Sequence, residues 1–153
     1  MINLGDEIQG EARVVSREHG IWALAEQRKR TGGDRPLVIL SGGETSVTVR
    51  GSGRGGRNVE YLLSLARHLE SARGICAIAC DTDGIDGSED NAGAYIDENT
   101  LRKAESLGLS ADKYLCNNDA YSFFEKLDQL VVTGPTLTNV NDFRAILIFG
   151  SKI

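Results

Sequence analysis

The sequence is poor in several residues and patterns that mark particular protein classes. It has three cysteines, Cys76, Cys80 and Cys116, and an odd number at irregular spacing argues against a disulfide framework. Its apolar runs, such as residues 36–40 and 75–80, are far short of the roughly 20 residues that a membrane helix needs. The first residues show no basic segment followed by an apolar stretch, so nothing indicates a secretory signal. We therefore expect a cytoplasmic protein without a membrane partner.

Histidine and positive charge are also scarce. The two histidines, His19 and His68, have no serine or cysteine nucleophile paired with them, which gives little support to a Ser–His–Asp or Cys–His mechanism. The formal net charge is −5. Because neutralising phosphates requires a surplus of lysine and arginine, an acidic chain is a poor general binder of nucleic acid. We therefore expect no nucleic-acid partner.

Glycine, in contrast, is abundant, with 18 residues against two prolines. The glycines gather in four clusters, at Gly32–Gly33, Gly42–Gly43, Gly51–Gly56 and Gly84–Gly87. Glycine is needed where the backbone takes a positive φ or where a ligand approaches closely. Four such clusters in a short chain indicate loops that are built around a small molecule.

Length and composition predict one globular domain over residues 1–153, with 41% hydrophobic and 25% charged residues. Apolar residues predict buried strands at 37–40, 74–80 and 143–149, the last nearly all apolar from Ala145 onward, and such strands are typical of a sheet that is covered on both faces. Periodic apolar residues predict helices over 6–30 and 58–70. Shorter elements are expected at 2–4, 46–50, 94–96, 100–107, 110–115, 120–127 and 130–133. We predict an α/β fold, namely a layered α/β/α domain with a mixed, largely parallel sheet.

Three predicted strands end in polar loops that contain glycine, at residues 41–45, 81–90 and 133–142. In open α/β sheets, ligands bind beyond the carboxyl ends of the strands. If the strands are parallel, these loops converge on one edge of the sheet, and we expect the functional site there.

The loop at 51–58 combines four glycines with Arg54 and Arg57 and leads into a predicted helix. Backbone N–H groups, guanidinium groups and a helix N-terminus all favour a phosphate or carboxylate. The loop matches neither the P-loop pattern nor the dinucleotide-binding fingerprint. A mobile loop with solvated arginines is the alternative interpretation.

The loop at 81–90 contains five carboxylates: Asp81, Asp83, Asp86, Glu89 and Asp90. Closely spaced carboxylates suit Mg²⁺ or Ca²⁺. The EF-hand pattern fails, because Ile85 stands at its fifth position. An acidic turn with capping aspartates is the other interpretation, and the spacing by itself favours it.

Three stretches carry a resemblance to a known family: SGGETSVTVRGSGRGGRNVEYLLSLA from Ser41, DTDGIDGSEDNAGAYID from Asp81, and NNDAYSFFEKLDQLVVTGPTLTNVNDFRAILI from Asn117. Together they resemble the C-terminal domain of the glycerate 2-kinase family, which is called the MOFRL domain. Bacterial members of that family also carry the name hydroxypyruvate reductase. The resemblance extends over residues 4–148 and rests on several motifs in the same order.

The resemblance implies an activity and a partner. Family members phosphorylate D-glycerate at its 2-hydroxyl with ATP and a divalent cation, Mg²⁺. They have a larger, Rossmann-like N-terminal domain, and a cleft lies between the two domains. That domain is absent from this chain, so we expect the chain to be catalytically incomplete without it or without a second chain that supplies it. Association of copies of the chain into a homo-oligomer is a further expectation.

Residue roles carried over from the family are hypotheses. Phosphoryl transfer depends on positioning and charge neutralisation, so the catalytic candidates are Arg54, Arg57 and Asp83. The candidate metal ligands are Asp81, Asp83 and Asp86. The candidates for binding glycerate or phosphate are Glu44, Thr45, Gly53, Gly55, Gly56, Asn58, Glu60, Thr133, Gly134, Thr136, Asn139, Asn141 and Asp142.

Other functions stay open on the sequence alone. The chain could be a hydroxypyruvate reductase, although nothing in the sequence supports binding of a nicotinamide. It could also be a stand-alone module that binds a small molecule without catalysis, or a self-associating domain without a ligand.

Overall fold

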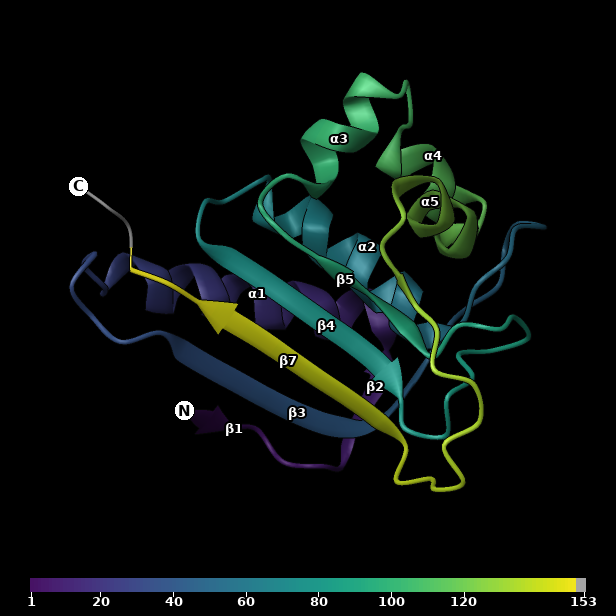
Figure 1. The fold of residues 1–153 in the computed structure, drawn as a ribbon, viewed down its shortest axis with the longest axis horizontal. Helices are drawn as coiled ribbons and strands as arrows, with labels where there is room; N and C mark the ends of the chain where they lie inside the picture. The colour runs from purple at the N-terminus through teal and green to yellow at the C-terminus, as the bar shows by residue number, and fades with distance from the viewer. Residues whose placement is uncertain (151–153) are drawn as a thin grey trace.

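In the computed structural model, the chain folds into a mixed β-sheet with helices packed against it (Figure 1). The structure describes residues 1–150. In chain order the elements are β1 (Ile2–Asn3), β2 (Ile8–Glu11), α1 (Ala12–Arg28), β3 (Leu37–Ser46), α2 (Arg57–Leu69), β4 (Ile75–Asp81), β5 (Gly93–Ile96), α3 (Thr100–Ser106), α4 (Ala111–Cys116), α5 (Ala120–Leu127), β6 (Leu130–Val131) and β7 (Asp142–Ile148). None of the helices within residues 1–150 is long and apolar enough to cross a membrane.

The sheet has the strand order β1-β3-β7-β4-β5-β6, and β2 also pairs with β3. β1 and β2 are parallel to β3, whereas all the other pairs are antiparallel. The predicted α/β class and mixed sheet are confirmed, but the sheet is not largely parallel. β3 and β4, which precede and follow α2 in the sequence, run in the same direction. The sheet is mixed because β7 lies between these two strands and runs in the opposite direction.

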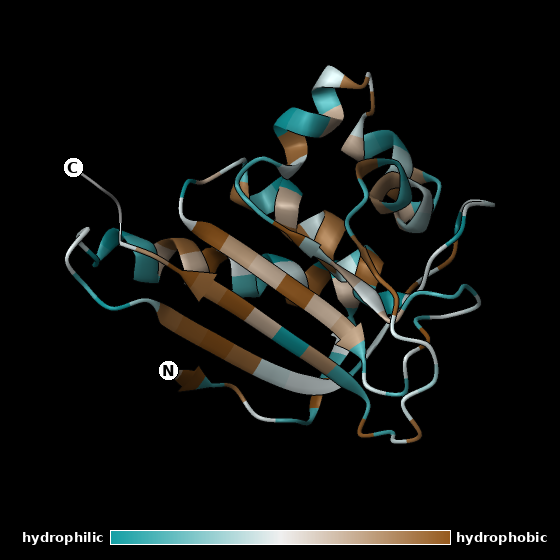
Figure 2. Cartoon of the chain, in the orientation of Figure 1, coloured by the Kyte–Doolittle hydropathy of each residue, from teal (hydrophilic) through white to brown (hydrophobic). Residues whose placement is uncertain are grey.

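This position of β7 determines where the predicted loops meet. Because β7 is antiparallel to its neighbours, it begins at the edge where β3 and β4 end. The segments 41–45, 81–90 and 133–142 therefore do converge on one edge of the sheet, but residues 41–45, which we predict as a loop, are the end of β3. Figure 2 shows hydrophobic colour along β3, β4 and β7 that turns hydrophilic towards this edge.

Helices cover only one face of the sheet (Figure 1). α2 lies in the middle of the helical layer and contacts α1, α4 and α5 as well as β4 and β5. The inward-facing side chains of the strands, such as Leu37, Ile75 and Ile146, are buried beneath it. The second helical layer of the predicted α/β/α arrangement is not found among residues 1–150, so the other face of the sheet is bare there.

Helix α2 forms the centre of the core and agrees with the prediction for 58–70 to within one residue at each end. Val59, Leu62, Leu63 and Leu65 are all fully buried, because helices and strands surround α2 on most sides. Truncating one such leucine to alanine typically costs about 2–5 kcal/mol. The helix ends at Glu70, which adopts a left-handed conformation with φ 48°.

The first helix is shorter than predicted, because residues expected in it join the sheet. It begins at Ala12 rather than at residue 6, and Ile8–Glu11 form β2 beside β3. Gly43 allows this approach: a Cβ there would lie 2.3 Å from the Ile8 carbonyl oxygen, and its φ is +111°. The strand predicted at 46–50 is not separate either, since β3 continues to Ser46 and residues 47–50 leave the sheet.

Candidate functional site

The candidate site lies at the edge of the sheet where the three loops meet, and Arg57 is at its centre. This residue opens α2 and reaches across to carboxylates on three strands. Its Nε donates to Asp142 Oδ1 at 2.8 Å, its Nη2 to Asp81 Oδ2 at 2.7 Å, and its Nη1 to Glu44 Oε1 at 3.2 Å. Five N–H hydrogens belong to a guanidinium, so one on each Nη atom has no partner among residues 1–150. Arg57 therefore remains able to hold an anion.

Asp142, the first residue of β7, organises this cluster. Its carboxylate is fully buried and accepts hydrogen bonds from Arg57, from Arg144 Nη1 at 2.9 Å, from Asn58 Nδ2 at 2.9 Å and from the Thr45 N–H at 3.3 Å. The sequence predicts ligand binding for Asp142, but all of these contacts are to the protein itself. The structure gives it the position of a residue that holds Arg57 in place.

A buried polar network continues beneath Asp142, and the sequence analysis missed it. Arg144 is 1% exposed, donates to the Gly42 carbonyl at 2.9 Å and lies over the ring of Tyr61 at 5.5 Å. The Tyr61 hydroxyl lies 2.8 Å from His19 Nδ1. One signal could have identified Arg144, because alternation along β7 places it on the same inward face as two buried isoleucines.

Burial and charge shift the pKa values of this cluster. Burial disfavours the charged guanidinium of Arg57, but the three carboxylates outweigh this effect, so the pKa of Arg57 is raised. Burial lowers the pKa of His19 to about 4, and the charge of Arg144 acts in the same direction. Burial also raises the pKa of Asp81, against hydrogen bonding from the Asp83 N–H and the charge of Arg57. The site thus keeps Arg57 cationic and His19 neutral near pH 7.

The N-terminus of α2 is filled by a carboxylate of the protein itself. Asp86 is fully buried and accepts from the Asn58 N–H at 3.0 Å and from the Val59 N–H at 2.9 Å. Burial raises its pKa to about 6 despite these hydrogen bonds. Asp86 therefore occupies the anion site expected at this helix N-terminus. Its carboxylate is buried there, so it does not face solvent as a metal ligand at the surface would.

The three candidate metal ligands do not come together. Asp81 is bound to Arg57, Asp86 to α2, and Asp83 accepts from the Ile85 N–H at 2.8 Å in a tight turn. Within residues 1–150, no group of three or more His, Cys, Asp or Glu side chains could hold a metal ion. The arrangement agrees with the capping-turn interpretation of this loop and does not fit Mg²⁺.

The glycine-rich loop packs against its own protein and not against an open site. Residues 50–54 lie on the turn 117–119, which accepts hydrogen bonds from every N–H of these five residues at 2.7–3.1 Å. A Cβ on Gly51 or Gly53 would come within 2.3 Å of that turn. Close approach does require glycine at these two positions, but the approaching group is the protein's own turn and not a ligand. These N–H groups are not available to cradle the phosphates of ATP.

Arg54 does not share a site with Arg57. Its side chain is 48% exposed and contacts Glu89 and Glu125 at 3.4 and 3.2 Å, with the guanidinium 4.6 Å from the centre of the Tyr121 ring. Such exposed contacts are typical of a surface arginine. The two arginines that the sequence analysis paired therefore lie in different surroundings.

The other predicted residues divide between the interior and the converging loops. Thr45 and Asn58 are buried beside Asp142, and Glu60 faces inward to Arg13, with Oε1 2.6 Å from the arginine Nε. Gly55 has φ +142°, and Gly56 lies against Asp86, which a Cβ there would meet at 2.3 Å. The last loop lies on the sheet edge and carries Thr133, Gly134, Thr136, Asn139 and Asn141. Backbone bonds tie this loop to residues 82–83, from the Thr136 N–H to Asp83 O and from the Thr82 N–H to Asn141 O.

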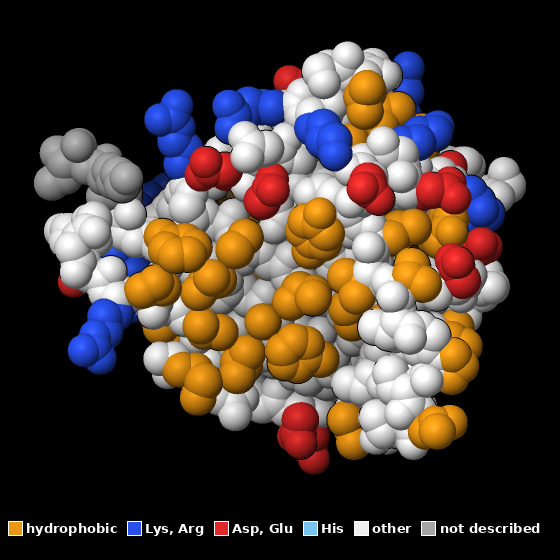
Figure 3. All heavy atoms as spheres, viewed as in Figure 1, with side chains coloured by type: hydrophobic (Ala, Val, Ile, Leu, Met, Phe, Trp, Pro, Cys, Tyr) orange, Lys and Arg blue, Asp and Glu red, His pale blue; other side chains and the backbone are white. Residues whose placement is uncertain are grey.

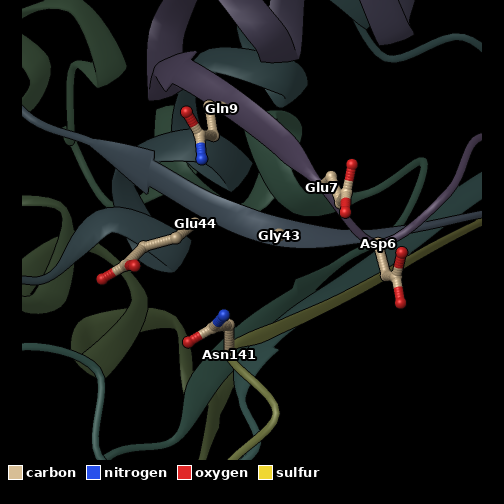
Figure 4. Close-up of a pocket in the computed structure, with 6 residues that line it drawn as sticks. All are labelled: Asp6, Glu7, Gln9, Gly43, Glu44 and Asn141. Carbon is tan, nitrogen blue, oxygen red and sulfur yellow. The ribbon is translucent and has the colours of Figure 1, made fainter.

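Two adjoining cavities flank the end of β3. The larger, of about 480 Å³, is lined by Asp6, Glu7, Gln9, Gly43, Glu44 and Asn141 (Figure 4). The other, of about 380 Å³, includes Leu40, Gly42, Thr82, Asp142 and Phe143 in its wall. The amides and three carboxylates of the first cavity suit a hydroxyl-bearing or cationic group and repel an anion, so an anionic group of a ligand would have to lie outside this cavity, against Arg57. The contribution of residues 6–9 was missed, because the sequence analysis placed them in a helix.

The chain is similar in sequence to a known family and to a glycerate kinase. Residues 37–142 match the MOFRL family. A protein of Agrobacterium vitis that carries a hydroxypyruvate reductase name is 51% identical over 147 residues, which are 95% of this chain and 38% of that protein. D-Glycerate 2-kinase of Thermotoga maritima is 41% identical over 131 residues, 83% of this chain and 31% of the kinase.

The likeness extends to three dimensions. The crystal structure of glycerate kinase from Thermotoga maritima superposes with a TM-score of 0.90 at 38% identity. The match covers 95% of this chain and 35% of the kinase chain. The chain thus spans about a third of the length of the relatives that it matches.

Proposed function

The chain belongs to the MOFRL family, and from this premise we propose that it is the C-terminal part of a glycerate 2-kinase, an enzyme that phosphorylates the 2-hydroxyl of D-glycerate with ATP. In this proposal the chain supplies one wall of a site, and the part of the kinase outside the matched third supplies the other. The proposal includes a cytoplasmic location, where ATP and glycerate are both available.

The observation that carries the proposal is the position of Arg57. Asp142 and Asp81 hold its guanidinium at the sheet edge, beside the cavity lined by Glu44, and its side chain is 26% exposed. A fixed guanidinium with free N–H groups suits a carboxylate or a phosphoryl group, both of which occur in this reaction. We infer that Arg57 binds one of these two anionic groups and Arg54 does not.

The rest of the catalytic apparatus lies elsewhere in this proposal. Among residues 1–150, no group of three or more His, Cys, Asp or Glu side chains could hold a cation, and the N–H groups of residues 50–54 are all bonded within the protein. The part of the kinase that the chain lacks would have to provide both a cation site and donors for the ATP phosphates. We therefore expect the chain alone to show no glycerate-dependent turnover of ATP.

The test is a chimera in which residues 1–153 replace the matching third of the Thermotoga maritima kinase. The chimera should form ADP in a glycerate-dependent reaction, and the isolated chain should not. Arg57→Ala should lower kcat/KM at least about 100-fold, because it removes a charge contact to the reacting groups. Arg67→Ala is the matched control: this exposed arginine on the same helix contacts only Asp112, so activity should stay within about twofold.

Two results would count against the proposal. If the chimera is inactive although it is folded, the chain does not supply a kinase wall. If Arg57→Ala retains activity within about threefold of the parent, Arg57 is not a ligand-binding residue.

Hydroxypyruvate reduction is the second candidate, because relatives that are 51% identical carry that name. A dinucleotide fold would place the pyrophosphate at a helix N-terminus, but Asp86 fills that position on α2. The same chimera should therefore not oxidise NADH or NADPH with hydroxypyruvate. Oxidation of either in the absence of phosphorylation would favour the reductase.

A further inference from the structure

The face of the sheet that no helix covers is apolar across four strands. One row across the strands contains Val38, Leu147 and Cys76 as successive neighbours. The next row contains Leu40, Ala145, Ile78 and Tyr95. The outer face consists of Val38, Leu40, Gly42, Cys76, Ile78, Cys80, Tyr95, Phe143, Ala145 and Leu147. None of these residues is charged, whereas Glu44, which follows Gly42 on the same side of β3, lies at the end of the strand beside the site. Figure 3 shows hydrophobic side chains gathered over this part of the sheet.

Such a face is unusual for a surface that stays in water. β3, β4 and β7 are mostly apolar on both sides, apart from the inward-facing Asp81, Asp142 and Arg144 near the site, and this is typical of strands in sheets covered on both faces. Phe143 is 45% and Tyr95 40% exposed, so large aromatic surface is left without a partner among residues 1–150. Contiguous exposed apolar patches of this kind mark interaction sites. A further layer must cover the outer face in the functional protein.

The length of the relatives indicates what this layer is. The Thermotoga maritima kinase has the same fold in the matched region, and that region is only 35% of its chain. The remaining part is therefore present beside this fold in a fixed one-to-one ratio. The outer face also continues into the site: Leu40, Gly42 and Phe143 line the same cavity as Asp142. A layer seated on the face would overhang the edge where Arg57 lies.

We propose that the outer face is the surface on which the rest of the kinase polypeptide packs. An apolar layer of that polypeptide would then form the third layer of the fold. The inference rests on the proposed function, since it takes the occupant to be the remainder of a glycerate kinase. It explains why two-sided apolar strands occur in a chain whose own helices cover one face.

The cysteines of the chain provide a direct test, with a control built in. Cys76 lies half-buried on the outer face, whereas Cys116 is exposed on α4, away from the sheet. Burial raises the pKa of the Cys76 thiol, so labelling with a maleimide is best followed near pH 8 in variants that keep one cysteine each. Cys76 should react in the isolated chain and at least about tenfold more slowly in the chimera. Cys116 should react at the same rate in both.

A charge on the face gives a second readout. Leu147→Lys should leave the unfolding temperature of the isolated chain nearly unchanged, because its side chain points outward, and should lower that of the chimera. Ile21→Lys is the control, since Ile21 is 56% exposed on α1 and away from the outer face, and it should change neither temperature.

The outcomes separate this inference from the proposed function. Equal labelling of Cys76 in the two proteins would overturn the inference even if the chimera phosphorylates glycerate. Protection of Cys76 in an inactive chimera would support the inference while the kinase proposal fails. A doubled mass of the isolated chain in light scattering, with Cys76 protected only at concentrations where the dimer forms, would overturn it in favour of a second copy of the chain.

Discussion

Arg57 and the glycine-rich loop at 50–54 are neighbours in the sequence and differ in almost every physical respect. Arg57 is held by the buried carboxylates of Asp81 and Asp142 and by the exposed carboxylate of Glu44. Arg54, at the end of the loop, reaches the partly exposed carboxylates of Glu89 and Glu125, and the loop itself packs on the turn 117–119. The comparison teaches that glycine and arginine in a loop do not by themselves make an anion site. What matters is whether their donors are already used and whether buried groups fix them.

The largest effect should come from breaking the buried half of this comparison. Asp142→Ala would leave Arg144 charged and buried without its carboxylate, which typically costs about 3–5 kcal/mol. Urea unfolding of the isolated chain measures this loss of unfolding free energy. Asp112→Ala, which removes an exposed carboxylate, should change it by no more than about 0.5 kcal/mol. A loss below about 1 kcal/mol for Asp142→Ala would show that the arginines find other partners.

The pH dependence of stability should sharpen the same comparison. The folded pKa of His19, about 4, is below its ordinary value of 6.5, so its contribution to stability rises as the pH increases between these values. The folded pKa of Asp86, about 6, is above its ordinary value of 3.8, so its contribution is full below that value and is lost as the pH rises to about 6. Each contribution is on the order of 2–3 kcal/mol, and the two oppose each other.

Removing either His19 or Asp86 should reveal the pH dependence of stability that the other group causes. Asp86→Asn should make the free energy of unfolding increase more steeply with pH between about 4 and 6.5 than in the parent chain, and His19→Gln should make it decrease. Urea unfolding at several pH values measures both slopes. Parallel curves for the parent and both variants would show that these groups titrate alike in the folded and unfolded chains.

The packing of the glycine-rich loop should have an intermediate effect. Gly53→Ala would place a Cβ 2.3 Å from the Asp119 Cβ and 2.7 Å from the Asn117 carbonyl oxygen, so the loop must shift, at a cost of about 1–3 kcal/mol. Gly33→Ala is the matched control, since a Cβ there meets nothing within 4 Å. Equal stability of the two variants would mean that the loop moves freely on the turn 117–119.

The smallest effect should come from Arg54. Arg54→Ala removes only exposed contacts, so the urea midpoint of the chain should not change measurably. In the kinase chimera its activity should stay within about twofold of the parent. A drop in activity comparable to that of Arg57→Ala would show that the glycine-rich loop belongs to the site.

Local patterns predicted much of this structure, because they depend on neighbouring residues. The periodic leucines of α2 and the apolar runs of β4 and β7 were identified nearly to the residue. The partners of each loop could not be predicted in this way. Nothing near Gly51 in the sequence indicates that the turn 117–119 will accept its N–H, and nothing near Leu37 indicates that β7 will be inserted beside β3.

The site shows the same division. The convergence of the segments 41–45, 81–90 and 133–142 could be predicted from the polar residues that follow each apolar run, whereas the three candidate metal ligands do not come together because Asp86 turns inward to cap α2. Residue spacing is the same for a capping aspartate and a metal ligand, and only the surrounding structure distinguishes them. Arg144 was missed because a buried charge was not sought within an apolar strand.

The short strands at both edges of the sheet have a consequence for aggregation. β6 and β1 have two residues each, and β2 has four, so neither edge presents a long row of unpaired backbone groups. Long, flat edges are templates on which chains add strand by strand into fibres. Concentrated solutions of this chain should therefore bind little of an amyloid dye such as thioflavin T.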